Sequence, residues 1–159
     1  MNEVMTTTWI KERAEAIRRA EKEKKMERDR QIEAASVLKA KTEPYWKELL
    51  EVLEESVKEF NREFPETERR IDQYEKSSAT TLIIRRTAYP AAAVKLSLNI
   101  AGTSIQYSIN STQRKGANTN EQQANLIIGI VDGQVGYVEG GVRTHDDVAR
   151  RLLEPFFDF

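Results

Sequence analysis

The spacing of apolar residues changes at Pro65, and this change limits the folds that are possible. Before Pro65 apolar residues recur at steps of three and four, the period of a helix that buries one face. After residue 68 they alternate with polar residues, the period of a strand with one buried face. The sequence therefore predicts an α+β fold, a two-layer domain in which helices pack on one face of an antiparallel sheet of about five or six strands. A long charged N-terminal helix precedes it.

Two helices are expected before Pro65. A stretch without glycine or proline, from about Trp9 to Lys41, predicts the first helix. Pro44 predicts a break, because proline disfavours helix at the residue before it. The second helix, about Pro44 to Phe64, places its apolar residues on one face: Trp46, Leu49, Leu50, Leu53, Val57, Phe60 and Phe64. We therefore expect a charged helical extension at residues 1–41 and a globular α+β domain at residues 42–159.

The first helix has an apolar seam that is not sustained. Ile10, Ala14 and Ile17 begin the seam, but the next positions are Glu21, Lys24 and Arg28. A coiled coil needs an apolar seam over several heptads, so the segment 18–31 is predicted to be a solvated single helix, a frayed helix or a weak pairing element. Residues 9–30 carry nine Lys/Arg and six Asp/Glu, a balance of +3. Residues 43–76 carry six and eleven, a balance of −5.

The strand pattern predicts two hairpins after two earlier strands, at 68–76 and 80–87. The first hairpin turns at Gly102-Thr103, which places Leu98 opposite Tyr107 and Leu96 opposite Ile109. The second turns at Asp132-Gly133, which places Ile130 opposite Val135 and Ile128 opposite Tyr137. A polar loop, 111–123, is expected between the hairpins. Phe156, Phe157 and Phe159 are expected to complete the core after a last helix that begins near Thr144.

His145 is the only histidine, and it lies beside Asp146 and Asp147. As a functional site it would be a general base or a metal ligand oriented by one aspartate. The simpler interpretation is a helix N-terminus, in which Thr144 is the N-cap and Asp147 completes a capping box. Adjacent residues at a helix start point in different directions, so we favour the cap. No catalytic residue and no metal ligand are therefore predicted.

Two charged groups could also mark sites. Glu51, Glu55, Glu59 and Glu63 form a column, but the Glu-x-x-His motifs of di-metal bundles are missing, so a solvated face is favoured. Arg85, Arg86 and Lys95, with the pair Arg114-Lys115, could form a nucleic-acid patch. The open face of the best hairpin carries no aromatic residue on which bases could stack. We therefore do not expect nucleic-acid binding.

Composition excludes further classes of function. The chain has 159 residues, a net charge of −1 and no cysteine, so it has no disulfide, thiolate nucleophile or cysteine metal site. No apolar run is long enough to cross a bilayer, and the first residues lack the apolar core of a signal peptide. A cytoplasmic protein without a membrane association and without a cofactor is the expectation.

Two hypotheses of function remain. In the first, the chain is a non-enzymatic interaction module that self-associates, as a homodimer for example, or docks a protein partner through Trp9, Ile10 and Ile17. An exposed tryptophan on a helix is a suitable anchor for a partner's groove. In the second, a small molecule binds, with weak catalysis as an option, in a pocket between the sheet and the second helix. That pocket would be lined by Trp46, Arg86, Tyr107 and Tyr137.

Overall fold

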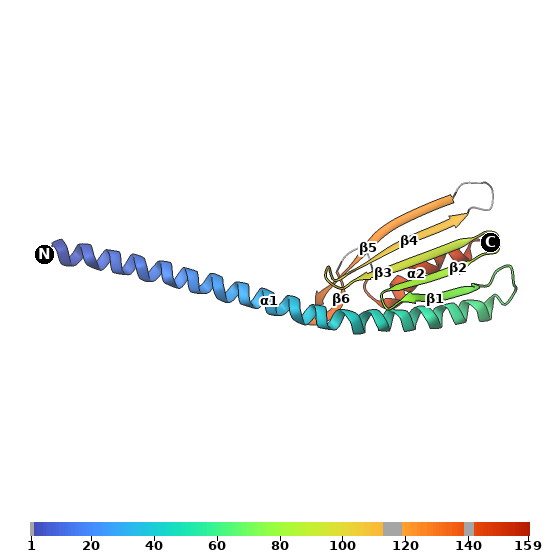
Figure 1. Cartoon of the computed structure of the whole chain (residues 1–159), viewed down its shortest axis with the longest axis horizontal. Coiled ribbons are helices and arrows are strands. Elements are labelled where there is room, and N and C mark those ends of the chain that lie inside the picture. Colours follow the sequence, from blue (N-terminus) through green and yellow to red (C-terminus); the bar gives the residue numbers. More distant parts are fainter. Residues whose placement is uncertain (1, 113–118, 139–141) are drawn as a thin grey trace. The chain divides into compact units, whose positions relative to one another are not determined.

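The computed structural model describes residues 2–112, 119–138 and 142–159 (Figure 1). The chain forms two compact units, Met1–Val37 and Leu38–Phe159. Its elements are a long N-terminal helix, six strands in one antiparallel sheet and a C-terminal helix. The predicted α+β class, with helices packed on a sheet, is therefore confirmed.

The first helix, α1, runs without interruption from Asn2 to Glu63 and contains Pro44. The predicted break at Pro44 is wrong. Proline removes the N–H that would bond to the carbonyl of Ala40. However, Thr42 and Trp46 are both buried, and the Thr42 hydroxyl donates to the carbonyl oxygen of Leu38 at 2.8 Å. Burial on both sides of the proline therefore keeps the backbone helical where local preference alone would end it.

The part of α1 that belongs to the first unit buries almost nothing. Among residues 7–37 every side chain is exposed except Ala14, which is half-buried. The segment 18–31 is helical and exposed throughout, which matches the solvated single helix among the three predicted alternatives. A helix without a buried face must be stabilised by its own side chains or by a partner.

The second unit contains a sheet whose strands are neighbours in chain order, each antiparallel to the next. The strands are β1 (Gln73–Ser78), β2 (Thr81–Arg86), β3 (Ala92–Asn99), β4 (Ser104–Thr112), β5 (Thr119–Val131) and β6 (Gln134–Tyr137). Within this unit the remainder of α1 and a second helix, α2 (His145–Leu153), lie on one face of the sheet (Figure 1). A short 3₁₀ turn, Glu154–Phe157, follows α2.

The core fills the space between the sheet and these helices. The predicted inward residues of α1 are buried from Trp46 to Phe60, and the inward residues of β3 and β4 alternate with exposed ones. The core strand residues are Leu82, Ile84, Val94, Leu96, Leu98, Ile105, Tyr107, Ile109, Leu126 and Ile128. The helix α2 adds Val148, Leu152 and Leu153. Alternation in the sequence thus identified the buried face of the sheet.

The register of the first predicted hairpin is wrong by two residues. Leu98 pairs with Ile105, and Leu96 pairs with Tyr107. The turn is longer than predicted, because the amide of Gly102 donates to the Asn99 side chain at 3.0 Å and Thr103, not Gly102, takes the positive φ of 47°. A shift of two residues leaves every side chain on its predicted face.

The second hairpin is confirmed as predicted. Ile130 pairs with Val135, and Ile128 pairs with Tyr137. Asp132 and Gly133 have φ values of 51° and 77°, the left-handed conformation that a tight hairpin turn of this type requires at both positions.

Two predicted boundaries are also corrected. The strand expected at 68–76 begins only at Gln73, because the chain forms a turn first, in which the amides of Arg69 and Arg70 donate to the carbonyl of Glu66. The polar loop expected at 111–123 is largely strand: β4 continues to Thr112, and β5 begins at Thr119. Its polar residues pair along the backbone while the side chains of 121–125 stay exposed.

Arg86 holds the C-terminal segment against the sheet. Its buried guanidinium donates to the carbonyl oxygens of Pro90 at 3.0 Å, Arg69 at 3.0 Å, Phe156 at 2.6 Å and Asp158 at 3.1 Å. Burial lowers the pKa of Arg86, and nearby Asp158 and Asp72 offset part of that effect. The guanidinium also lies over the rings of Phe156 and Phe159. One buried arginine therefore fixes the end of the chain.

Candidate functional site

The start of α2 is capped as the sequence predicted. The Thr144 hydroxyl accepts from the amide of Asp147 at 3.1 Å, and the Asp147 carboxylate accepts from the amides of Arg143 and Thr144. Those amides hold the pKa of Asp147 below its usual value. Thr144 and Asp147 thus form the predicted capping box.

His145 has additional contacts that the sequence did not indicate. Its Nδ1 lies 2.8 Å from the buried hydroxyl of Tyr137, and its Nε2 lies 3.3 Å from a carboxylate oxygen of Glu48. Tyr45 packs against the imidazole, with ring centroids 4.2 Å apart. A neutral imidazole that accepts from Tyr137 and donates to Glu48 satisfies all three groups.

This Tyr137–His145–Glu48 chain links β6, α2 and α1. Burial lowers the pKa of His145, although the hydrogen bond and charge of Glu48 oppose it. Burial also raises the pKa of the Tyr137 hydroxyl, as do Tyr45 and Glu48. Because both ring nitrogens already have partners, a substrate would have to break one of these bonds to use the imidazole as a base.

Three of the four residues of the predicted pocket have a hydrogen-bond partner elsewhere in the unit. The Trp46 Nε1 donates to the carbonyl of Ala79 at 3.1 Å, and Arg86 donates to the carbonyls described above. The Tyr137 hydroxyl bonds to His145. Tyr107 is buried on the helix-facing side of β4. Their hydrogen bonds therefore hold the fold together and do not converge on one ligand position.

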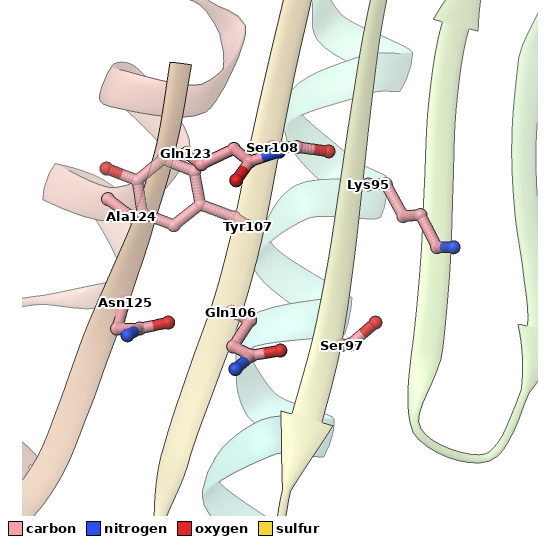
Figure 2. Close-up of a pocket in the computed structure, with 8 residues that line it drawn as sticks. All are labelled: Lys95, Ser97, Gln106, Tyr107, Ser108, Gln123, Ala124 and Asn125. Atoms are coloured by element: carbon pink, nitrogen blue, oxygen red, sulfur yellow. The ribbon is translucent and has the colours of Figure 1, made fainter. Parts of the chain in front are cut away.

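A polar hollow does lie on the opposite, open face of the sheet (Figure 2). It has a volume of about 530 Å³ and six polar side chains from three neighbouring strands: Lys95, Ser97, Gln106, Ser108, Gln123 and Asn125. In Figure 2 the helices lie behind the strands and these side chains lie in front of them. The ring of Tyr107 belongs to the other face, so the hollow offers amides, hydroxyls and one ammonium but no aromatic platform.

The basic residues proposed as a nucleic-acid patch do not gather into one. Arg86 is buried, while its neighbour Arg85 is exposed. Lys95 lies on the open sheet face. The pair Arg114-Lys115 lies outside the described residues. The structure therefore brings no two of the described basic side chains together at an open aromatic surface.

The residues predicted to bind a partner are exposed. Trp9, Ile10 and Ile17 have 57%, 50% and 50% of their surface accessible. Ile10 and Ile17 are seven residues apart and so lie on one side of the helix, with Trp9 beside them. Arg13 and Lys24 fall on the same side, at steps of three and seven from Ile10 and Ile17. This basic apolar face is the set Trp9, Ile10, Arg13, Ile17 and Lys24.

A groove that the sequence did not predict lies in the second unit, between α2 and the last turns of α1. Its apolar end has a volume of about 360 Å³ and is formed by Phe60, Phe64, Ala149, Leu153 and Phe157, with Ser56, Glu59, Glu63, Asp146 and Arg150 around them. Phe157, which we expected in the core, is about half exposed and packs against Phe60 and Phe64 at ring-centroid distances of 5.0 and 6.0 Å. Its neighbour Phe156 is buried, as expected.

The groove continues into an acidic hollow along α1. Glu51, Val52, Glu55, Ser56, Glu59 and Asp146 form this second part, and Ser56, Glu59 and Asp146 also border the apolar end. Lys58 pairs with Glu54 and Glu55, and Arg62 pairs with Glu59. Within the part of the chain that the structure describes, Glu51, Glu63 and Asp146 form no ion pair. We call the two hollows together the α1–α2 groove.

Among the described residues, no group of three or more His, Asp or Glu side chains is arranged to hold a metal ion. No helix among them combines the length and the apolar character that a membrane span requires.

Comparison with known proteins found no matching family, no similar characterised protein and no similar solved structure.

Proposed function

We propose that this chain is a non-enzymatic protein-interaction module that associates through the basic apolar face of its N-terminal helix. The observation that supports this most strongly is the exposure of Trp9, Ile10 and Ile17 on a part of α1, residues 7–37, in which no side chain is buried. When a partner covers large aromatic and aliphatic residues in that setting, the burial of their apolar surface contributes most to the free energy of binding.

The form of the helix supports the same proposal. From Trp9 to Val37 it has exposed side chains on every side, yet its large apolar residues near the start lie close together rather than scattered. Met26, in contrast, lies on the opposite side from Ile10. A solvated helix needs no tryptophan for its own stability, and Trp9 keeps 57% of its surface accessible. The cluster is best explained by contact with another molecule.

The test compares the wild type with Trp9→Ala/Ile17→Ala by sedimentation velocity over a range of concentrations and at low and high salt. The wild type should self-associate, and the double variant should remain monomeric. Alanine favours helix, so the substitution preserves the helix while it removes apolar surface. Met26→Ala is the matched control, since it removes an exposed apolar side chain from the other side. A wild type that is monomeric in every condition, or a double variant that associates as the wild type does, contradicts the proposal.

A further inference from the structure

We infer that the partner of the basic apolar face is the α1–α2 groove of a second copy of this chain. This inference rests on the proposed function and names both the partner and its binding surface. The first argument is chemical complementarity. The groove has an apolar end at Phe60, Phe64 and Phe157 and an acidic remainder. The helix has an apolar start and basic residues after it.

The second argument is length. The distance from Ile10 to Lys24 along a helix is about 21 Å, at 1.5 Å per residue. The distance from Glu51 to Phe64 along α1 is about 20 Å by the same measure. The charged and apolar ends of the two surfaces are therefore equally far apart.

The order of residues fixes the direction of docking. An antiparallel arrangement places Trp9 and Ile10 at the apolar end beside Phe64, and Lys24 at the acidic end beside Glu51. Ile17 then lies near Ser56, where the two hollows meet. The parallel arrangement would place the tryptophan among carboxylates and Lys24 among phenylalanines, so it is disfavoured by desolvation of the charge.

The charges in the groove favour a basic occupant. Glu51, Glu63 and Asp146 have no ion-pair partner within the described residues, so a cation from another molecule can approach them without breaking a pair. The carboxylates along α1 also repel one another at four-residue spacing. Arg13 and Lys24 would reduce that repulsion on docking. Glu21, four residues after Ile17, lies on the same helix face and offsets part of this attraction, so the attraction depends on the cations of that face.

The contact joins two different surfaces, the basic apolar face and the α1–α2 groove, and each copy of the chain has one of each. Such a contact is heterologous, and it allows a test by exchange of charges between copies. The helix variant Arg13→Glu/Lys24→Glu gives a copy whose helix and groove are both acidic. The groove variant Glu51→Lys/Glu59→Lys gives a copy in which both are basic. All four residues are exposed, and the ion pair of Glu59 with Arg62 is a surface pair, so each fold should stay within about 1 kcal/mol of the wild type, which a thermal melt checks.

Each reversed variant alone should self-associate roughly tenfold more weakly than the wild type, or not at all, because attraction becomes repulsion. An equimolar mixture of the two should associate again, because the acidic helix of one fits the basic groove of the other and the reverse pairing also holds. Glu51→Gln/Glu59→Gln should give intermediate association. The control Glu75→Lys/Glu121→Lys makes the same change of net charge on exposed strand positions and should leave association unchanged.

The outcomes separate this inference from the proposed function. If Trp9→Ala/Ile17→Ala abolishes association but the groove variant associates normally, or the mixture fails to associate, the groove is not the binding surface and the helix binds elsewhere. In that case the proposed function stands and this inference is overturned. If the wild type is monomeric at every concentration and salt, both are overturned.

Discussion

Replacement of Arg86 by methionine should destabilise the second unit severely. Methionine has a similar length and no charge, so the change removes the hydrogen bonds and keeps much of the volume. The carbonyls of Pro90 and Phe156 are buried with their Arg86 donors, whereas those of Arg69 and Asp158 are partly accessible to water. An unsatisfied buried acceptor costs about 1–3 kcal/mol, so the two buried carbonyls together predict a loss of about 2–6 kcal/mol.

Urea denaturation measures this loss as the difference in the free energy of unfolding. A domain of this size is stable by about 5–15 kcal/mol, so the expected loss is a large fraction. Arg85→Met is the matched control, because Arg85 is the adjacent residue on the same strand but is exposed. It should change stability by no more than about 0.5 kcal/mol. If Arg86→Met and Arg85→Met cost the same, the hydrogen bonds of Arg86 do not hold the C-terminal segment and this reasoning is refuted.

Three further predictions concern the second unit. Because burial lowers the pKa of His145 below 6.5, the wild type should lose stability as the pH falls through about 6.5. In chemical denaturation, His145→Gln should lose less stability than the wild type between about pH 8 and pH 5, and an equal loss would contradict this. Thr144→Ala should lower the free energy of unfolding by about 1 kcal/mol through the lost cap, and an unchanged value would show that the capping box is not stabilising. Leu96→Ala should cost about 2–5 kcal/mol and Ser97→Ala less than about 0.5 kcal/mol in the same assay, and the reverse order would place the wrong face of β3 in the core.

The sequence predicted the faces of the sheet better than its registers. Alternation identifies which side of a strand is buried, and a shift of two residues leaves that side unchanged. The register itself depends on the turn. Asp132-Gly133 specifies a tight turn, and the register of its hairpin was predicted correctly. The register at Gly102-Thr103 was predicted wrongly, because the Asn99 side chain accepts from the amide of Gly102 and the turn is longer.

Pro44 shows why local preference failed at one position. The rule that proline ends a helix describes an isolated backbone. Here Thr42 and Trp46 are buried on either side, and their packing outweighs one missing hydrogen bond.

The candidate sites depended on tertiary contacts to different degrees. The exposed cluster Trp9, Ile10 and Ile17 could be recognised from helical spacing alone. The α1–α2 groove could not, because it requires α2 to pack beside the end of α1 and Phe157 to turn outward. The hydrogen bond between His145 and Tyr137 could not be predicted from the sequence either, because it joins β6 to the start of α2.

The absence of cysteine in the chain permits a direct test of the contact between two copies. Ala20 lies between Ile17 and Lys24 on the basic apolar face, and antiparallel docking brings it close to Val52 in the acidic hollow. A mixture of Ala20→Cys and Val52→Cys proteins should therefore form a disulfide-linked pair under mild oxidation, as seen by non-reducing electrophoresis. A mixture of Ala20→Cys with Ser97→Cys, which lies on the open sheet face, should form it much more slowly. Equal rates of cross-linking in the two mixtures would contradict docking of the helix in the groove.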